Sequence, residues 1–318
     1  MPSLSVVPDP VDRLFSGAPD IGPTHALLAV HRGQVVLERY GDGIGEGTTL
    51  RSWSMAKSML HAAVGMLVAE GALVLDDPAP VPAWSDPADP RHAITLRHLM
   101  TMRSGLAWVE APAEGQRSDV VDMFYGNGRR PFDDTAAWAA ARPLAAEPGS
   151  RFLYSSGNSA IVSGIVRDLV GSGPDYERWL RDRLFDPLGM TSATPKFDPS
   201  GAWMASSFCY CTARDFARFG ELYLADGLWD GTRLLSEDWV ATARTETGRD
   251  DEGRIHTAHW WRFGDNPWGA YHCSGYLGQY VVVVPPLDLV VVRLGDSPPS
   301  DRGQVAEALR SLIVGFER

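Results

Sequence analysis

Residues 51–60 read RSWSMAKSML and place a serine and a lysine, Ser54 and Lys57, three positions apart. On a helix, residues at this spacing lie on the same face, so the lysine amine can reach the serine hydroxyl. A serine hydroxyl is a weak nucleophile until a neighbouring base takes its proton, and a desolvated lysine in its neutral form can be that base. The pair therefore indicates covalent catalysis by an activated serine.

Lysine is rare in this chain: Lys57 and Lys196 are the only two, and arginine supplies nearly every other basic position. Arginine cannot serve as a base because its guanidinium does not lose its proton in proteins. The choice of lysine rather than arginine beside Ser54 thus indicates a group that has to lose and regain a proton. The alternative is that Ser54 only caps the helix and that Lys57 is a solvated residue of its first turn.

The elements that must position this pair follow from the hydrophobic pattern. Residues 25–41 form two apolar runs around a central Arg-Gly-Gln, which predicts a β-hairpin. From Ser54 onward, apolar residues recur at helical spacing as far as Leu67, and Gly71 is placed to end the helix. Ser54 would then lie at a helix N-terminus, where free backbone N–H groups can face a developing oxyanion. The first of these donors would be the backbone N–H of Ser54 itself.

Helical patterns dominate the middle of the chain, at 134–141, 160–169, 175–184 and 215–224. Two Val-rich runs in 278–295 predict a second hairpin, and 304–314 a closing amphipathic helix. We therefore expect an α/β protein whose antiparallel sheet is built from both chain termini and flanked by helices. Its sheet domain would comprise residues 1–75 and 255–318, and its mostly helical inserted domain residues 76–254.

Composition limits the partners of this 318-residue chain. A net charge of −11 argues against a nucleic-acid or anionic-membrane surface, and a neutral or cationic small molecule suits it better. The first residues lack the basic start and apolar run of a secretory signal, and no run of about 18 apolar residues occurs, so we expect a cytoplasmic protein. Three cysteines are too few for a disulfide framework. We expect no metal or cofactor.

Ser-x-x-Lys is the nucleophile motif of β-lactamases and penicillin-binding proteins, and further stretches follow in the same order as in that family. Over residues 25–295 the chain resembles the serine hydrolases that include class C β-lactamases, D-alanyl peptidases, β-lactamase-like esterases and nylon-oligomer hydrolases. The resemblance is carried by RSWSMAKSM, ITLRHLMTMRSGL (94–106), EPGSRFLYSSGNSAIVSGIVRDLVG (147–171), LFDPLGM (184–190) and SGYLGQYVVVVPPLDLVVVR (274–293).

In that family a tyrosine completes the serine and lysine pair, and the resemblance implies this role for Tyr154, which would share one proton with Lys57. Without the pair, Tyr154 would be a core or rim residue. The asparagine of the family's Tyr-x-Asn element is replaced by Ser156, with Asn158 two positions on, and both are candidates for substrate contact. A hydroxyl lacks the paired donor and acceptor of an amide, which counts against a true β-lactamase.

The family's third element aligns with Cys273-Ser274-Gly275, where the usual basic residue is absent. The resemblance implies that Ser274 and Gly275 contact substrate and that the backbone N–H of Tyr276 is the second oxyanion donor. We expect Cys273 to be a packing residue and His272 to point to the opposite face of the strand.

Two aromatic residues are further candidates for substrate contact. Trp53, next to Ser54, would give an apolar wall, although tryptophans are also ordinary core residues. Tyr125 lies in a segment comparable to one that covers the active site of nylon-oligomer hydrolases, and the alternative for it is a solvated loop.

These features predict a serine hydrolase that acts through an acyl-enzyme on short-chain carboxylic esters or small linear amides. Alternatives within the class are an aminohexanoate-oligomer hydrolase and a weak β-lactamase or D-alanyl peptidase. The alternative of another class is a catalytically idle relative that binds a ligand in the same cleft. The sequence predicts no oligomeric state.

Overall fold

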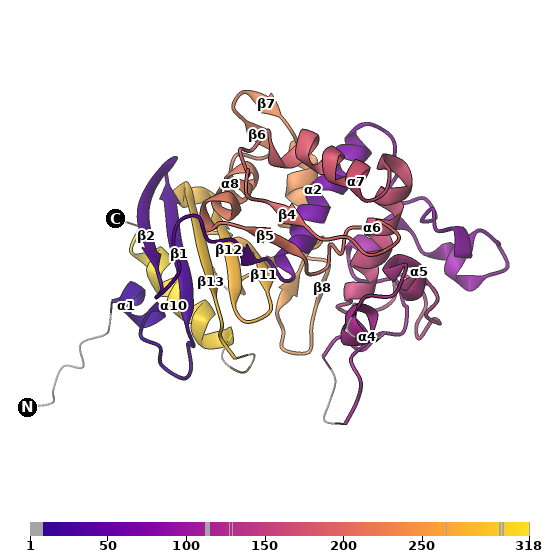
Figure 1. The fold of residues 1–318 in the computed structure, drawn as a ribbon, viewed down its shortest axis with the longest axis horizontal. Coiled ribbons are helices and arrows are strands. Elements are labelled where there is room, and N and C mark those ends of the chain that lie inside the picture. Colours follow the sequence, from indigo (N-terminus) through magenta and orange to yellow (C-terminus); the bar gives the residue numbers. More distant parts are fainter. Residues whose placement is uncertain are drawn as a thin grey trace, which may run out of the picture.

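The structure is a computed structural model that describes residues 9–111, 115–126, 128, 130–264, 266–298, 300 and 302–317. Its centre is an eight-stranded antiparallel sheet in the order β2-β1-β13-β12-β11-β10-β9-β8 (Figure 1). These strands are β1 Thr24–His31, β2 Gln34–Tyr40, β8 Gly248–Arg249, β9 Ile255–His256, β10 Trp261–Arg262, β11 Tyr271–Gly275, β12 Gln279–Val284 and β13 Leu289–Gly295. Strands from both ends of the chain pair directly, which confirms the predicted fold class.

Both predicted hairpins are present. Strands β1 and β2 are joined by Arg32 and Gly33, whose φ angles of 52° and 70° are those that a two-residue hairpin turn requires. Strands β12 and β13 are joined by the turn Pro285–Leu287 and Asp288. Every residue of β12 and β13 is buried, because helices cover both faces of the sheet, and this explains valine runs that do not alternate with polar residues.

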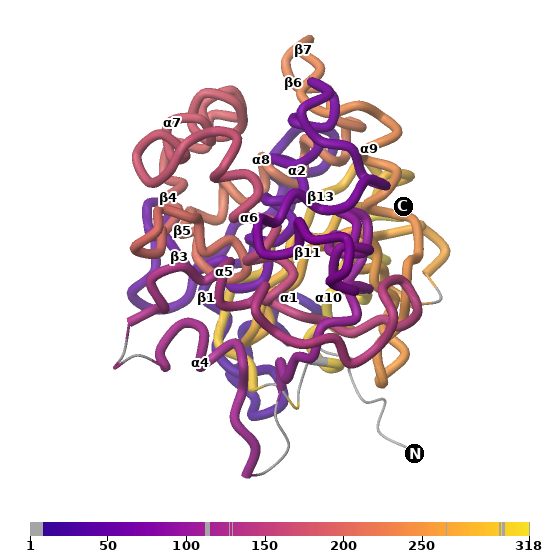
Figure 2. Tube along the Cα trace, turned by 90° about the vertical axis from the view of Figure 1, so that its right-hand side faces the viewer, coloured from indigo at the N-terminus to yellow at the C-terminus, as the bar shows by residue number. Residues whose placement is uncertain are grey.

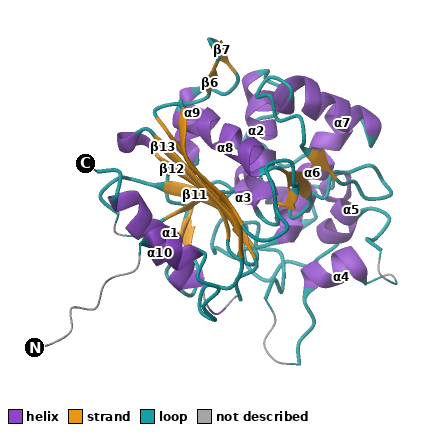
Figure 3. Ribbon diagram, turned by 60° about the vertical axis from the view of Figure 1, so that its left-hand side comes forward, coloured by secondary structure: helices purple, strands orange, loops and turns teal. Residues whose placement is uncertain are grey.

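One face of the sheet is covered by two helices from opposite ends of the chain, α1 Pro10–Leu14 and α10 Arg302–Val314 (Figure 3). The other face packs against α2 Met55–Ala69. Every residue of α2 from Met55 to Leu67 is buried, as expected of a helix that is apolar on all sides. It lies between the sheet and the helical part of the molecule, and Gly71, with φ 72°, follows its end as predicted.

The helical part of the molecule surrounds α2 and contains a small sheet. Its helices are η1 Pro82–Trp84, η2 Pro90–Ala93, α3 Leu96–Met100, α4 Asp119–Tyr125, α5 Thr135–Ala140, α6 Ser156–Val170, α7 Pro174–Leu180, η3 Arg181–Phe185, α8 Ala213–Leu224 and α9 Glu237–Thr242. The small sheet has the order β3 Leu50–Arg51, β5 Cys209–Cys211, β4 Thr194–Pro195. A hairpin of β6 Leu228–Trp229 and β7 Thr232–Arg233 projects from the body (Figure 2).

Helix α8 belongs by sequence to the segment 76–254, which we expected to form the helical domain, yet it packs directly on the central sheet. A Cβ on Gly220 of α8 would lie 2.6 Å from Val290 and 2.8 Å from Val281, so the helix approaches the strands closely. Strand β8 of the central sheet also falls in this segment. The division into two domains stays a prediction. Within the described residues, no helix is both long and apolar enough to cross a bilayer.

Candidate active site

Ser54 lies at the start of α2, after a tight turn that the small sheet holds in place. Strand β3 pairs with β5, and the Ser52 N–H extends this pairing by donating to the Cys209 carbonyl at 2.8 Å. Trp53 then adopts a left-handed conformation with φ 47°, which is strained for a bulky residue. No acceptor for the Ser54 backbone N–H is found among the described residues, so this predicted oxyanion donor is available to a ligand.

The Lys57 amine is buried beside Ser54, and only 2% of the residue is exposed. Its Nζ lies 3.1 Å from Ser54 Oγ, 3.0 Å from Ser156 Oγ and 2.9 Å from the Ser206 carbonyl oxygen. The Ser54 side chain makes no capping hydrogen bond to its helix. The alternative of a capping serine and a solvated lysine is therefore wrong.

Tyr154 lies next to this lysine, with Lys57 Nζ 5.0 Å from its ring centroid. The ring also packs against Trp261, at 5.3 Å between centroids, and edge-on to His256, at 6.0 Å. Within the part of the chain that the structure describes, no hydrogen bond joins the phenol to Lys57 or to Ser54. The structure thus places the three side chains together, and proton sharing between the phenol and the amine stays a prediction.

A carboxylate that sequence reasoning missed lies behind the lysine. Glu110 Oε1 accepts a hydrogen bond from the Ser156 hydroxyl at 2.6 Å, and its Oε2 accepts from the Ser156 backbone N–H at 2.8 Å. The indole N–H of Trp108 donates to the same Oε2 at 2.6 Å. Ser156 is the first residue of α6, so the carboxylate also lies at the positive end of that helix.

Asn158, a predicted substrate-binding residue, has a different place in the structure. It is 1% exposed, its Oδ1 accepts from the Ser104 hydroxyl at 2.8 Å, and its Nδ2 lies 3.6 Å from Met102 Sδ. Because the amide is buried and engaged between α6 and the segment after α3, Asn158 is a packing residue rather than one offered to a ligand.

Strand β11 brings the third family element next to Ser54. A Cβ on Gly275 would lie 2.5 Å from the Ser52 carbonyl oxygen, so only glycine allows this strand to approach the turn before Ser54 so closely. Cys273 is buried, and burial raises the pKa of its thiol to about 12, which leaves it unreactive. His272 packs against Phe263 and Tyr280 on the opposite face of the strand, as predicted.

The residues around Gly275 reach the surface. Ser274 is half-buried. Tyr276 is 42% exposed, and its ring packs edge-on against Trp53 with centroids 5.2 Å apart. The Tyr276 side chain thus lies beside the turn before Ser54, and the role of its backbone N–H as the second oxyanion donor stays a prediction.

Arg51 connects the remaining candidates at the mouth of the site. Its guanidinium lies between the rings of Trp53 and Phe208, 3.5 and 3.7 Å from their centroids. It donates to the Ser207 carbonyl at 3.2 Å, next to the carbonyl that Lys57 contacts. Burial lowers the pKa of Arg51, and the neighbouring phenol of Tyr125, a residue that is 45% exposed, partly offsets this. Trp53 and Tyr125 thus belong to one aromatic and cationic cluster beside Ser54.

Two histidines near Lys57 are held neutral. Burial, followed by the charge of Lys57, lowers the pKa of His259 to about 3, and its Nδ1 contacts the Lys57 carbonyl at 3.2 Å. Burial also lowers the pKa of His256 far below its usual range. Rings with such low pKa values are weak bases at neutral pH, and the proton-accepting roles of Lys57 and Tyr154 beside Ser54 stay predictions. No cluster of three or more His, Cys, Asp or Glu that could hold a metal occurs among the described residues.

Comparison with known proteins gives one family over nearly the whole chain. The family model described as Beta-lactamase matches residues 11–314. The chain is 28% identical over 316 residues to 6-aminohexanoate-dimer hydrolase of Paenarthrobacter ureafaciens, a match that covers 92% of this chain and 79% of the relative. It is 33% identical over 188 residues to Esterase EstB of Burkholderia gladioli, which covers 56% of this chain and 47% of the esterase.

Solved structures show the same fold. A Bacillus anthracis protein provisionally described as a 6-aminohexanoate-dimer hydrolase superposes with a TM-score of 0.80 at 24% identity, over 98% of this chain and 82% of that one. A family VIII carboxylesterase superposes with a TM-score of 0.72 at 15% identity, over 95% of this chain and 96% of that one. At these identities the structural likeness establishes the fold.

Proposed function

Because the chain belongs to the Beta-lactamase family, we propose that it is a serine hydrolase that cleaves short-chain carboxylic esters or small linear amides through an acyl-enzyme on Ser54. The observation that carries this proposal is the buried Lys57 amine, 3.1 Å from Ser54 Oγ. A buried amine is costly for stability, and its use as a base for the serine gives a reason for its presence.

In the proposed reaction, Ser54 Oγ attacks the carbonyl carbon while its proton passes to the Lys57 amine, with the Tyr154 phenol as the second proton carrier. The backbone N–H groups of Ser54 and Tyr276 stabilise the oxyanion. Collapse of this intermediate sends the proton to the leaving alcohol or amine and leaves the acyl group on Ser54. Water then attacks the acyl-enzyme with the same groups moving the proton.

Esters are the favoured substrates, because an alcohol needs less help from an acid to leave than an amine does. Cys273 and Ser156 occupy positions where the resemblance leads us to expect a basic and an amide side chain, so recognition of a β-lactam or a D-alanyl peptide lacks two contacts. The similarity to Esterase EstB supports the ester proposal. The similarity to 6-aminohexanoate-dimer hydrolase makes a linear amide the second candidate.

The test is hydrolysis of p-nitrophenyl acetate and p-nitrophenyl butyrate. We expect an initial burst of nitrophenol, equal to the enzyme concentration if deacylation is slower than acylation, and its loss in Ser54→Ala and Lys57→Ala. A fluorophosphonate probe should label the wild-type chain on Ser54 and should not label Ser54→Ala.

Parallel assays separate the alternatives. Faster turnover of an aminohexanoate dimer than of either ester would replace the ester proposal with the amide one, and faster turnover of nitrocefin would favour a β-lactamase. A folded wild-type protein that shows neither turnover nor labelling would instead be a ligand-binding relative.

A further inference from the structure

The hydrogen bonds around Lys57 form a continuous chain that the proposed reaction has not yet used. It runs from Trp108 through Glu110 and Ser156 to Lys57 and ends at Ser54. Three donors converge on the two oxygens of Glu110, an arrangement that matches the ionised carboxylate, because that form only accepts hydrogen bonds.

The direction of each bond follows from this carboxylate. Ser156 has one hydroxyl proton and donates it to Glu110 at 2.6 Å. Its oxygen must therefore accept from the Lys57 amine, which lies 3.0 Å away. The Ser206 carbonyl, 2.9 Å from Lys57 Nζ, can also only accept.

These two acceptors occupy both N–H bonds of a neutral lysine amine. The third direction, toward Ser54 Oγ at 3.1 Å, is then that of the nitrogen lone pair. A base whose lone pair already faces the hydroxyl does not have to reorient before it accepts the proton.

We propose that Glu110 is a positioning residue for this proton transfer: acting through Ser156, it holds the Lys57 lone pair toward Ser54 and stabilises the ammonium that forms there. The proton of Ser54 moves to Lys57 Nζ as the bond between Ser54 Oγ and the carbonyl carbon forms. The π electron pair of the carbonyl moves onto its oxygen, which becomes the oxyanion. No proton moves to Glu110, and the Ser156 proton stays on Ser156. This inference rests on the proposed function and adds a residue to it.

Other titratable groups near Lys57 do not supply this negative charge. Tyr154 presents the face of its ring to the amine, and His256 and His259 are neutral because burial lowers the pKa of both. Arg51 is a cation. Among these neighbours, Glu110 is the group that can stabilise a transient ammonium.

The main test is the isosteric change Glu110→Gln, assayed with p-nitrophenyl butyrate across pH. We expect kcat/KM on the plateau to fall by about 10²-fold, mostly through kcat. We also expect the acid limb of the pH profile to move to lower pH, because the ammonium loses a nearby anion and gives up its proton more readily. A fault in packing alone would lower the plateau without moving this limb.

The matched control is Glu147→Gln, the same change at an exposed carboxylate outside the site, which should keep wild-type rates. Ser156→Ala should show a similar loss, and the double variant Glu110→Gln/Ser156→Ala should be no slower than the slower single variant, because both residues act in one chain. Thermal unfolding of each variant checks that it is folded.

Two results would overturn the inference: a Glu110→Gln protein with wild-type kcat/KM, or losses that multiply in the double variant. Either result, obtained with a wild-type protein that shows the burst and Ser54 labelling, leaves the proposed function intact. Absence of burst and labelling in the wild type would instead remove the proposed function itself.

Discussion

At the scale of single residues, the proposed chemistry depends on an amine that can lose a proton. We expect Lys57→Arg to lower kcat/KM for p-nitrophenyl butyrate by at least about 10³-fold, because a guanidinium keeps its positive charge and cannot accept the Ser54 proton. The matched control is Lys196→Arg, which changes the only other lysine, an exposed one, and should leave the rate unchanged. Equal activity of the two variants would show that no titration of Lys57 is needed.

The same scale shows what a sequence can and cannot reveal about a site. Ser54 and Lys57 were predictable because their contact is local, three residues apart on one helix. Glu110 was not predictable, because its bond to Ser156 joins residues 46 positions apart and Glu110 lies in an irregular segment without periodicity. Asn158 was predicted wrongly because its side chain is turned into the packing between α6 and the segment after α3, through a contact with a residue 54 positions away.

At the scale of elements, the site needs β11 to lie close to the turn before α2. We expect Gly275→Ala to lower kcat on the order of 10²-fold, because a Cβ there would meet the Ser52 carbonyl oxygen at 2.5 Å and displace the Tyr276 N–H. In the control Gly264→Ala, the new Cβ meets nothing within 4 Å, so activity should be retained. A fully active Gly275→Ala protein with an unchanged melting temperature would contradict this account of β11.

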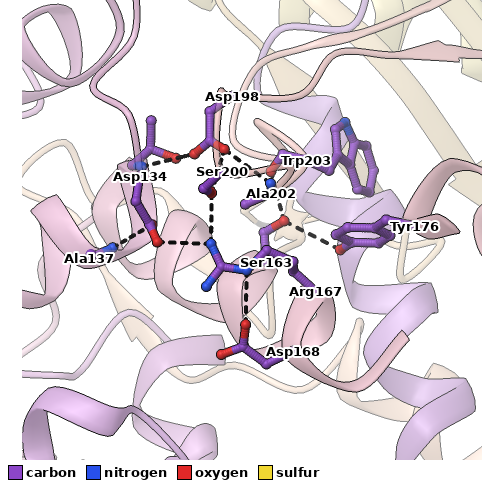
Figure 4. A network of polar contacts seen from close by, with 11 residues as sticks. Asp134, Ala137, Ser163, Arg167, Asp168, Tyr176, Asp198, Ser200, Ala202 and Trp203 are labelled. Atoms are coloured by element: carbon purple, nitrogen blue, oxygen red, sulfur yellow. Dashed lines mark hydrogen bonds and ion pairs between the residues drawn. The ribbon is translucent and has the colours of Figure 1, made fainter. Parts of the chain in front are cut away.

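A second prediction concerns the polar network that ties α5, α6 and the loop after β4 together (Figure 4). Asp198 accepts from the Thr135 backbone N–H and hydroxyl and from the Ala202 N–H, and a Ser200 hydroxyl links it to Arg167. Asp198→Ala should lower the free energy of unfolding by about 3 kcal/mol, because it leaves buried donors without an acceptor.

The control for this network is Asp168→Ala. Asp168 contacts Arg167 as well, but its side chain is 45% exposed, and loss of such an ion pair costs about 0–1 kcal/mol. Urea unfolding of both variants measures the difference. Equal losses would show that burial of Asp198 is not what makes the network stabilising.

Elements were predictable in proportion to their length. The hairpins β1–β2 and β12–β13 and the helix α2 are long enough to show apolar runs or a helical period, and each was predicted. Strands β3, β8, β9 and β10 have two residues each, too few to show any alternation. Their positions depend on contacts with parts of the chain that are distant in sequence, and β3 in particular pairs with β5 just before the turn that leads into Ser54.

At the scale of the whole molecule, buried neutral histidines make the fold sensitive to acid. Burial lowers the pKa of His259 and of His272 to about 3, and that of His61 and His256 far below its usual range. Between pH 6.5 and 3, the unfolded chain binds protons that the folded chain excludes. The free energy of unfolding should therefore fall as pH decreases from about 6.5, by up to about 1.4 kcal/mol per pH unit for each histidine.

Urea unfolding at pH 7.5 and pH 5.5 measures this dependence. His272→Phe, which keeps an aromatic ring between Phe263 and Tyr280, should show a smaller loss between the two values than the wild type. Equal unfolding free energies at both values in the wild type would contradict the prediction.

The position of β13 between β1 and β12 has a consequence for how the protein is made. While a ribosome extends the chain, the hairpin β1–β2 can form early, but the edge of β1 that pairs with β13 stays open until residues 289–295 have emerged. Acquisition of the native state is therefore expected to be late and slow, since the sheet closes only through contacts between residues far apart in sequence. Until β13 pairs with it, we expect this open edge of β1 to be a place where nascent chains can aggregate.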